Sequence, residues 1–292
     1  MKEIFDTLNL GVAKNVSKLG GLTNKNYRVE TLENDFVVRL PGKDTDKIID
    51  RADEATIVKA IEPLGIDAPL TMFDDVSGLK ICEHIPGAIT MNTKMMQEPH
   101  YQLKVAHLLK TLHKDAPNVP VKFDVLEMIE RYERTIKSAS GYLPQDYETT
   151  KTDIVGIQKA YDDPSIVDVL SHNDPLPENF ILSSDGGLYL VDWEYGGMNS
   201  PYWDVADVSI ESAYDFAQDE RFLHAYLGHK PTSSDWHQFN LNKLYIDLLW
   251  SLWGYVRETL KEEHEVEDFI MYGNDRFARL KRNLRKFKES IN

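Results

Sequence analysis

Residues 172–179 of this chain read His-Asn-Asp-Pro-Leu-Pro-Glu-Asn and form a polar loop between two short apolar stretches. The stretch before the loop covers residues 166–170, and the stretch after it covers residues 180–182. A further apolar stretch at 188–191 leads into Asp192, which is followed by Trp-Glu. Short apolar runs bounded by turn residues are typical of strands, so we expect strands on both sides of the loop. The loop itself carries histidine, aspartate and asparagine in the spacing H-x-D-x4-N.

The residue types in this loop are those that phosphoryl transfer from ATP requires. A carboxylate must lie near the accepting hydroxyl group, and an amide and a second carboxylate must hold magnesium against the phosphates. We therefore expect Asp174 to act as the base, with Asn179 and Asp192 as ligands of Mg2+. His172 is expected to brace the loop. The alternative is a loop in which these residues only make turns, but the full spacing favours the functional interpretation.

The first third of the chain predicts a small antiparallel sheet with one helix. The helix is predicted over residues 51–64 from the helical spacing of its apolar positions. The strands are expected at 16–19, 27–32, 36–40, 70–73 and 79–85, where β-branched and aromatic residues gather.

Two charged residues in this part predict a contact with ATP. Arg39 lies in the third expected strand, and Glu54 lies early in the helix. A base on this strand paired with an acid on this helix positions the α- and β-phosphates in protein kinases. Unrelated surface charges are the alternative, but the loop at 172–194 favours the pair. The stretch 20–24, Gly-Gly-Leu-Thr-Asn, offers small residues whose backbone N–H groups can approach phosphate oxygens.

From about residue 93 the apolar spacing becomes helical. Helices are predicted at 94–113, 124–137 and 146–161, and almost continuously after Pro201, with Ser200 as an N-cap. The expected fold class is therefore α+β, with a small lobe of one sheet and one helix followed by a larger, mainly helical lobe. Residues 1–85 are expected to form the nucleotide-binding lobe, and residues 86–292 the catalytic and substrate-binding lobe.

The composition argues against several kinds of partner. The 292 residues contain 33 Lys and Arg against 48 Asp and Glu, which gives a formal net charge of −15. This balance disfavours nucleic acid and anionic membrane surfaces and suits a cationic small molecule. The single cysteine, Cys82, excludes an internal disulfide, and we expect a cytoplasmic protein. The longest apolar stretch, 244–256, is interrupted by Asp247 and is too short to span a bilayer.

The sequence resembles the choline/ethanolamine kinase family, one branch of the protein-kinase-like phosphotransferases that also include the aminoglycoside phosphotransferases. The resemblance runs from about residue 16 to about residue 280, and it is strongest to the short bacterial choline kinases. The stretches that carry it are 20–27, 37–42, 53–55, 172–174, 178–180, 190–195, 203–204 and 250–253.

This resemblance implies a bilobal, protein-kinase-like fold, with ATP between the lobes and an alcohol substrate on the helical lobe. It assigns the base and the magnesium ligands to the same three loop residues, and it gives Asp204 a bracing role. The ATP site that it implies consists of Gly21, Thr23, Asn24, Arg39, Glu54, Glu83 and Ile85. The last two fall at the hinge, where backbone groups would meet adenine.

Aromatic residues predict which alcohol is phosphorylated. The trimethylammonium group of choline donates no strong hydrogen bond, so its recognition needs aromatic faces and a nearby carboxylate. Trp250 and Trp253 lie on a second apolar face of a predicted helix, although packing in the core is the alternative. The resemblance implies a choline pocket that consists of Tyr195, Glu211, Phe216, Trp250, Trp253 and Tyr272.

Other functions remain open at this stage. Ethanolamine, thiamine or an aminoglycoside could take the place of choline in the same kinase chemistry. A metal-dependent hydrolase using His172, Asp174 and Asp192 would leave Arg39 and Glu54 without a role. A binding module without catalysis would normally have lost one of the three loop residues. The oligomeric state does not follow from the sequence.

Overall fold

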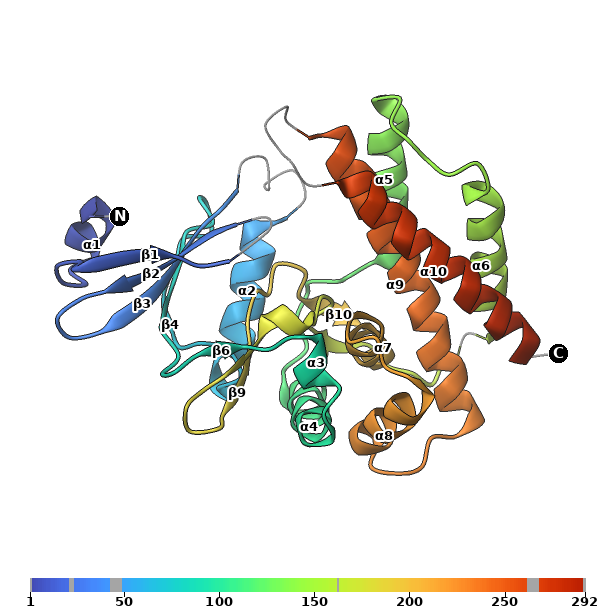
Figure 1. Cartoon of the computed structure of the whole chain (residues 1–292). Coiled ribbons are helices and arrows are strands. Elements are labelled where there is room, and N and C mark those ends of the chain that lie inside the picture. Colours follow the sequence, from blue (N-terminus) through green and yellow to red (C-terminus); the bar gives the residue numbers. More distant parts are fainter. Residues whose placement is uncertain (1, 21–23, 43–48, 162, 262–267, 291–292) are drawn as a thin grey trace.

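The computed structural model describes residues 2–20, 24–42, 49–161, 163–261 and 268–290. It consists of a small lobe built on an antiparallel sheet and a larger, mainly helical lobe (Figure 1). The sheet of the small lobe has the strand order β1-β2-β3-β5-β4. Its strands are β1 (Asn15–Lys18), β2 (Lys25–Glu30), β3 (Asp35–Leu40), β4 (Leu70–Phe73) and β5 (Lys80–Glu83). All five lie within or overlap the strands that the sequence predicts.

Each face of this sheet has its own partner, because side chains alternate along a strand. Val38 of β3 is fully buried on one face, in an apolar cluster with Phe36 and Ile81. The helix α1 (Lys2–Leu8) covers this face through Phe5, whose ring centroid lies 5.6 Å from that of Phe36. Arg39 of β3 therefore lies on the opposite face, toward α2 and the large lobe.

Helix α2 (Arg51–Ile61) begins where Asp50 accepts hydrogen bonds from the backbone N–H groups of Ala52 and Asp53. It continues into a short 3-10 helix, η2 (Glu62–Leu64), and the segment ends at Gly65 in the left-handed conformation. The predicted helix over 51–64 is thus confirmed. The helix α1 was not predicted from the sequence.

The large lobe contains two small sheets, one of β6-β8-β9 and one of β10-β7. Its strands are β6 (Ile89–Thr90), β7 (Val169–Ser171), β8 (Phe180–Leu182), β9 (Leu188–Leu190) and β10 (Gly197–Asn199). Its helices are α3 (Thr93–Met96), α4 (Pro99–Asp115), α5 (Val125–Ser138), α6 (Tyr147–Tyr161), α7 (Pro201–Glu211), α8 (Phe216–Leu227), α9 (Ser233–Thr259) and α10 (Phe269–Ser290), with a short 3-10 helix η3 (Pro177–Asn179).

Two sequence predictions need correction in this lobe. The single helix expected at 94–113 is two helices, because Pro99 begins a new helix and cannot continue the hydrogen bonding of α3. The very short strands β6 and β10 were not predicted. Ser200 caps α7 as expected, since its hydroxyl oxygen accepts a hydrogen bond from the backbone N–H of Tyr202.

Helix α9 is the central element of the large lobe, and it is packed by α5, α6, α7 and α10 (Figure 1). Both of its predicted apolar faces are buried: Leu248 and Leu252 are inaccessible to solvent, and Trp250 and Trp253 nearly so. Helices α9 and α10 approach closely at two glycines, Gly254 and Gly273. A Cβ atom at Gly273 would lie 2.5 Å from Cε1 of Tyr255 and 2.9 Å from the carbonyl oxygen of Ser251.

Gly273→Ala is expected to lower the free energy of unfolding by about 1–3 kcal/mol, because the added methyl group must separate α9 from α10. Gly156→Ala is the matched control, since a Cβ atom at this position of α6 meets no atom within 4 Å. The control is expected to stabilise the protein by up to about 1 kcal/mol through helix propensity. Urea unfolding measures both. Equal stability of the two variants would contradict the close packing of α9 and α10.

Candidate active site

The loop after β7 turns sharply at Asn173, which has a φ of 67°. Few residues other than glycine adopt this left-handed conformation, but asparagine tolerates it better than most. The loop then passes Asp174 and forms the short helix η3, which ends at Asn179. The turn therefore separates His172, which is fully buried, from Asp174, which is partly accessible.

The carboxylate of Asp204, on α7, binds the backbone of this loop. One of its carboxylate oxygens accepts a hydrogen bond from the backbone N–H of Asn173 at 2.8 Å. The other accepts from the backbone N–H of His172 at 2.8 Å and from Nε2 of His113 at 3.0 Å. Burial alone would raise the pKa of Asp204, but the hydrogen bond from His113 and its charge hold that pKa below its ordinary value. Asp204 thus has the bracing contacts that the sequence resemblance implies.

The side chain of Asn173 connects the loop to the segment after Asp192. Its Nδ2 group donates to the carbonyl oxygens of Tyr195 at 2.9 Å and of Gly197 at 3.2 Å. Its Oδ1 atom accepts a hydrogen bond from Nδ2 of Asn199 at 2.9 Å. Sequence reasoning missed this role of Asn173. The only sequence signal for this role was the position of Asn173 between His172 and Asp174 of the loop motif.

His172 is a positioning residue. Its Nε2 atom lies 2.9 Å from the carbonyl oxygen of Val191, the residue before Asp192, and its ring packs against Trp193. Burial lowers the pKa of His172, so the ring is neutral at physiological pH and donates to this carbonyl group. These contacts fix the end of β9 relative to the loop.

Asp174 and Asn179 face each other across the loop. Nδ2 of Asn179 donates to the backbone carbonyl oxygen of Asp174 at 2.9 Å, and no donor among the described residues binds the amide oxygen of Asn179. Burial raises the pKa of the Asp174 carboxyl well above its ordinary value, and the charges of Asp192 and Glu211 act in the same direction. A carboxylate of raised pKa is a stronger base toward a hydroxyl proton.

Asp192 has a φ of 69° and is the second residue of the site in the left-handed conformation. Burial and the charge of Glu194 raise the pKa of Asp192 to about 7. Its Oδ1 atom lies 3.5 Å from Nη1 of Arg39. Two non-glycine residues in this sparsely populated conformation, Asn173 and Asp192, therefore flank the centre of the site.

Arg39 and Glu54 form the buried ion pair that the sequence predicts. Two hydrogen bonds join the guanidinium group to the carboxylate, at 2.5 Å and 2.9 Å. Burial would raise the pKa of Glu54, but the charge of Arg39 holds it below its ordinary value. Arg51 adds a second guanidinium group, 2.9 Å from Glu54, and it also binds Glu194 of the large lobe. Sequence reasoning missed the roles of Arg51 and Glu194.

Aromatic side chains gather near Asp174, whose charge acts on Tyr195 and Tyr272. The ring centroids of Tyr195 and Trp250 lie 5.1 Å apart, and those of Trp253 and Tyr272 lie 5.3 Å apart. We call these four residues the aromatic group. Beside it, the guanidinium group of Arg276 lies 3.8 Å from the centre of the Tyr272 ring.

Glu211 is bound by two arginines of α10. Its carboxylate oxygens accept hydrogen bonds from Nη2 of Arg276 at 2.8 Å and from Nη2 of Arg279 at 2.9 Å. The prediction that Glu211 lies near the aromatic residues agrees with these contacts, because Arg276 touches both Glu211 and Tyr272.

Phe216 is not part of the aromatic group. Its ring is exposed and stacks on Trp236, with ring centroids 5.2 Å apart. Trp236 precedes Trp250 by 14 residues on α9, which is about 21 Å along the helix axis. The expectation that Phe216 forms a wall of the pocket therefore needs correction. Its place at the start of α8 directs it to the other end of α9.

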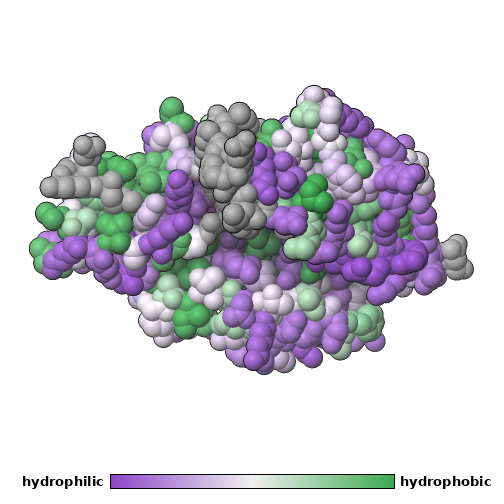
Figure 2. All heavy atoms as spheres, turned by 45° about the horizontal axis from the view of Figure 1, so that its top comes forward, coloured by the Kyte–Doolittle hydropathy of each residue, from purple (hydrophilic) through white to green (hydrophobic). Residues whose placement is uncertain are grey.

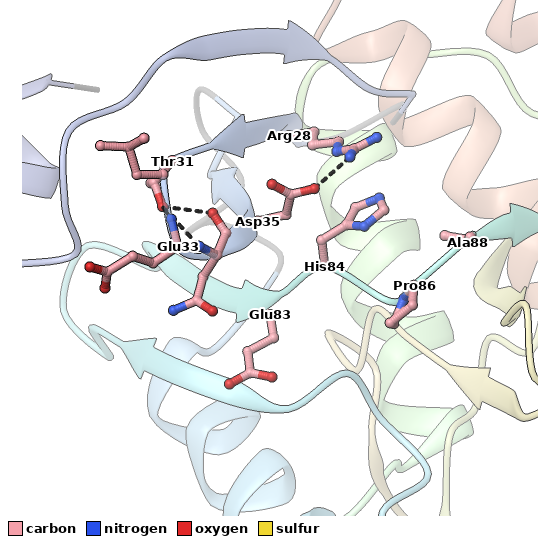
Figure 3. Close-up of a pocket in the computed structure, with 11 residues that line it drawn as sticks. Arg28, Thr31, Glu33, Asp35, Glu83, His84, Pro86 and Ala88 are labelled. Atoms are coloured by element: carbon pink, nitrogen blue, oxygen red, sulfur yellow. Dashed lines mark hydrogen bonds and ion pairs between the residues drawn. The ribbon is translucent and has the colours of Figure 1, made fainter.

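The hinge after β5 borders a cavity of about 730 Å³. Glu83 and His84 line it from the hinge, and Arg28 and Asp35 line it from β2 and β3 (Figure 3). Arg28 is paired with Val37 across the two strands, so it lies on the same face of the sheet as Arg39. Figure 2 shows the surface hollowed where the two lobes meet.

The remaining predicted ATP contacts are only partly described. Gly21 and Thr23 lie outside the described residues. Asn24 is buried, and its side-chain amide has no hydrogen-bond partner among the described residues. Ile85 is buried next to the hinge cavity.

A small antiparallel lobe joined by a hinge to a helical lobe, with this loop between them, is the architecture of the protein-kinase-like phosphotransferases. A sequence model described as Choline/ethanolamine kinase matches residues 16–239, and the chain belongs to that family. It is therefore an enzyme, and its class is that of the kinases. Among the described residues, no helix is both long and apolar enough to cross a membrane.

Three relatives illustrate the similarity. Protein LicA of Haemophilus influenzae is 26% identical over 254 residues, which cover 85% of this chain and 74% of that protein. The crystal structure of choline kinase LicA from Streptococcus pneumoniae is 31% identical with a TM-score of 0.83, and the match covers 98% of each chain. A structure of LicA in complex with AMP is 31% identical with a TM-score of 0.81, over 98% of this chain and 97% of that one.

Asp204→Asn is expected to lower the free energy of unfolding by about 2–5 kcal/mol. Both carboxylate oxygens now accept hydrogen bonds from backbone N–H groups, and in the variant an amide NH2 group would replace one of these oxygens and leave a buried N–H group without an acceptor. Asp75→Asn, at an exposed position after β4, is the control and is expected to change stability little. Urea unfolding of the two variants measures the difference. An unchanged stability of Asp204→Asn would show that the loop does not depend on this carboxylate.

Proposed function

We propose that the protein transfers the γ-phosphate of ATP to the hydroxyl group of choline. The observation that carries the proposal is the arrangement of Asp174, Asn179 and Asp192 around one braced loop, with the Arg39–Glu54 pair opposite and aromatic residues beside it. The kinase family of the chain and the choline kinase named among the relatives support it.

In the proposed reaction the substrate oxygen attacks the γ-phosphorus, and the bond from this phosphorus to the β–γ bridging oxygen breaks. The hydroxyl proton passes to the carboxylate of Asp174, and the products are phosphocholine and ADP. The raised pKa of Asp174 suits it to hold this proton. Asp174 must be deprotonated before it can accept this proton. The positive charges of Mg2+ and of the substrate's ammonium group, when bound, favour the deprotonated carboxylate.

Asn179 and Asp192 would hold magnesium in this proposal. Both offer the hard oxygen ligands that Mg2+ prefers, and the amide oxygen of Asn179 accepts no hydrogen bond from the part of the chain that the structure describes. When bound, the ion neutralises the charge that develops on the phosphates. Asp192 remains partly accessible, with 35% of its side chain exposed, so a ligand can reach it.

ATP is proposed to lie between the lobes, with its adenine at the hinge near Glu83 and Ile85. The hinge cavity and its position on the Arg39 face of the sheet support this placement. Arg39, held by Glu54, would then meet the α- and β-phosphates, and the predicted contacts of Gly21 and Thr23 stay part of the proposal. The unpartnered amide of Asn24 suits a phosphate or sugar oxygen.

Choline is proposed to place its trimethylammonium group against the aromatic group, with its hydroxyl at Asp174. Aromatic faces attract a quaternary ammonium through the ring quadrupole, whereas ethanolamine would favour hydrogen-bond acceptors. Tyr195 and Tyr272 are partly exposed, so the group borders a space that a ligand can enter.

ADP release from Mg-ATP tests the proposal directly, with choline, ethanolamine, thiamine, kanamycin and no acceptor compared side by side. We expect the rate with choline to exceed the others. Asp174→Asn is expected to lower it by about 100-fold or more, because the base is lost. Asp185→Asn, in the exposed turn between β8 and β9, is the control that should retain activity.

The outcomes separate the parts of the proposal. Faster turnover of another acceptor would keep the kinase chemistry and overturn the choice of choline. Release of ADP with choline that is unchanged in Asp174→Asn would overturn the role of the base.

Trp253→Ala is expected to raise the KM for choline by about tenfold or more, because a desolvated cation–π contact is worth about 2 kcal/mol. Trp236→Ala is the matched control on the same helix, since Trp236 contacts Phe216 rather than the aromatic group. Steady-state kinetics at saturating ATP measures both variants. Equal KM values for the two would argue against recognition by the aromatic group.

A further inference from the structure

Asp207 is a buried carboxylate for which the bracing and binding contacts described so far give no role. It lies on α7 and is inaccessible to solvent. Neither of its carboxylate oxygens has a hydrogen-bond partner among the described residues. An ionised carboxylate that is buried without a partner is strongly destabilising, so Asp207 is suited to bind a cationic ligand.

The position of Asp207 on α7 places it beside the candidate substrate site. It follows Asp204, which holds the catalytic loop, by three residues and precedes Glu211 by four. Residues at these spacings share one face of a helix. The carboxylates of Glu211, Asp174 and Asp204 act on Asp207 and disfavour its charge, whereas the guanidinium group of Arg276 favours it. Asp207 therefore lies between the base and the arginine-bound end of the helix.

The arginines near this site are engaged by other carboxylates. Arg276 and Arg279 bind the two oxygens of Glu211. Arg279 also binds Asp247 of α9 at 2.8 Å through its Nε atom. Glu211 is thus already neutralised when no substrate is bound, whereas Asp207 has no such pairing among the described residues. Arg276 acts on Asp207 without a hydrogen bond to it, so Asp207 is the carboxylate of this face of α7 that a bound cation could contact directly.

The second observation comes from α9. Nε1 of Trp250, a member of the aromatic group, is also buried without a hydrogen-bond acceptor among the described residues. Helix α9 packs against α7, and the charge of Asp207 also acts on Tyr272 of the aromatic group. An unpartnered carboxylate and an unpartnered indole therefore belong to the same region.

The chemistry of the substrate fits this arrangement. Two carbon atoms separate the hydroxyl group of choline from its ammonium nitrogen. With the hydroxyl at Asp174, the cation must lie within a few ångströms of it. The face of α7 that carries Asp204 and Asp207 meets this loop through the bonds of Asp204. Coulomb attraction at such distances is strong where water is excluded.

We propose that Asp207 is the counter-ion of the substrate's ammonium group and that it, rather than Glu211, determines the preference for a cationic alcohol. This inference rests on the proposed function. Glu211, bound to both arginines, positions α10 and its Tyr272. The aromatic group then fits the shape of the ammonium group and attracts it through the ring quadrupoles, and Asp207 provides the negative charge that neutralises it.

The state of Asp207 without substrate agrees with this role. Burial raises the pKa of Asp207 well above its ordinary value, with the charge of Glu211 acting in the same direction. A cation bound nearby favours the ionised form, so substrate binding replaces a proton. Asp207→Asn replaces the carboxyl group by an amide of nearly the same shape, so that no charge can form at this buried position. The variant is therefore expected to be at least as stable as the parent protein, which a purely structural carboxylate would not allow.

The test compares choline with its neutral carbon isostere, in which a tert-butyl group replaces the trimethylammonium group. Steady-state kinetics gives kcat/KM for both alcohols with the parent protein and Asp207→Asn. We expect the preference for choline over the isostere to fall about tenfold or more in the variant, through KM, because the two alcohols differ only in charge. Activity on the isostere should change little.

Asp153→Asn is the matched control, since it removes one negative charge at the surface of α6, where Asp153 binds Lys288. It should retain the parent's preference. A preference for choline that is equally strong in Asp207→Asn would overturn the assignment, as would a large loss of stability with both alcohols affected alike. If the parent protein releases no ADP with choline, the proposed function fails, and the counter-ion role is overturned with it.

Discussion

The carboxylate of Asp204 holds the loop on which the rest of the candidate site depends. Two backbone N–H groups and one imidazole donate hydrogen bonds to its two oxygens, and these bonds fix the position of the loop relative to α7. Asn173 can keep its left-handed conformation because these bonds and those of its own side chain fix it on both sides. The direction of Asp174 follows from this turn, and the position of Asn179 follows from its bond to Asp174.

Buried ion pairs between charged side chains connect the two lobes. Glu54 binds Arg39 and Arg51, and Arg51 in turn reaches Glu194 of the large lobe. Such buried pairs add little net stability, because desolvation offsets most of the Coulomb energy. Their contribution is geometric, since each bidentate or shared contact allows few arrangements of the groups. The small lobe therefore faces Asp192 in one orientation.

Much of this site could be predicted from the sequence because its key groups lie in short segments. The spacing H-x-D-x4-N predicted that Asp174 and Asn179 act together. The kinase pairing of a base on the third strand with an acid on the next helix predicted the pair of Arg39 and Glu54. Both ends of that pair lie within 15 residues of each other. The strands and most helices followed from the period of their apolar residues.

Other features depend on contacts between distant segments and could not be predicted. Arg51 meets Glu194 across 143 residues, and the role of Asn173 depends on carbonyl groups beyond β9. Phe216 sits at the other end of α9 because the start of α8 determines its direction, which no local pattern encodes. Helix α1 is stabilised by its packing on the sheet through Phe5, rather than by its own short sequence.

In the choline site proposed above, the glycine contact between α9 and α10 limits how the substrate of the enzyme could change. Trp250 and Trp253 stand on one of these helices and Tyr272 on the other, and backbone meets backbone where they cross. The spacing of the aromatic walls is consequently set by main-chain atoms, which cannot yield by changing a rotamer. Evolution toward a larger or smaller alcohol must proceed by exchanging the wall residues themselves, one side chain at a time, while the frame that carries them stays the same.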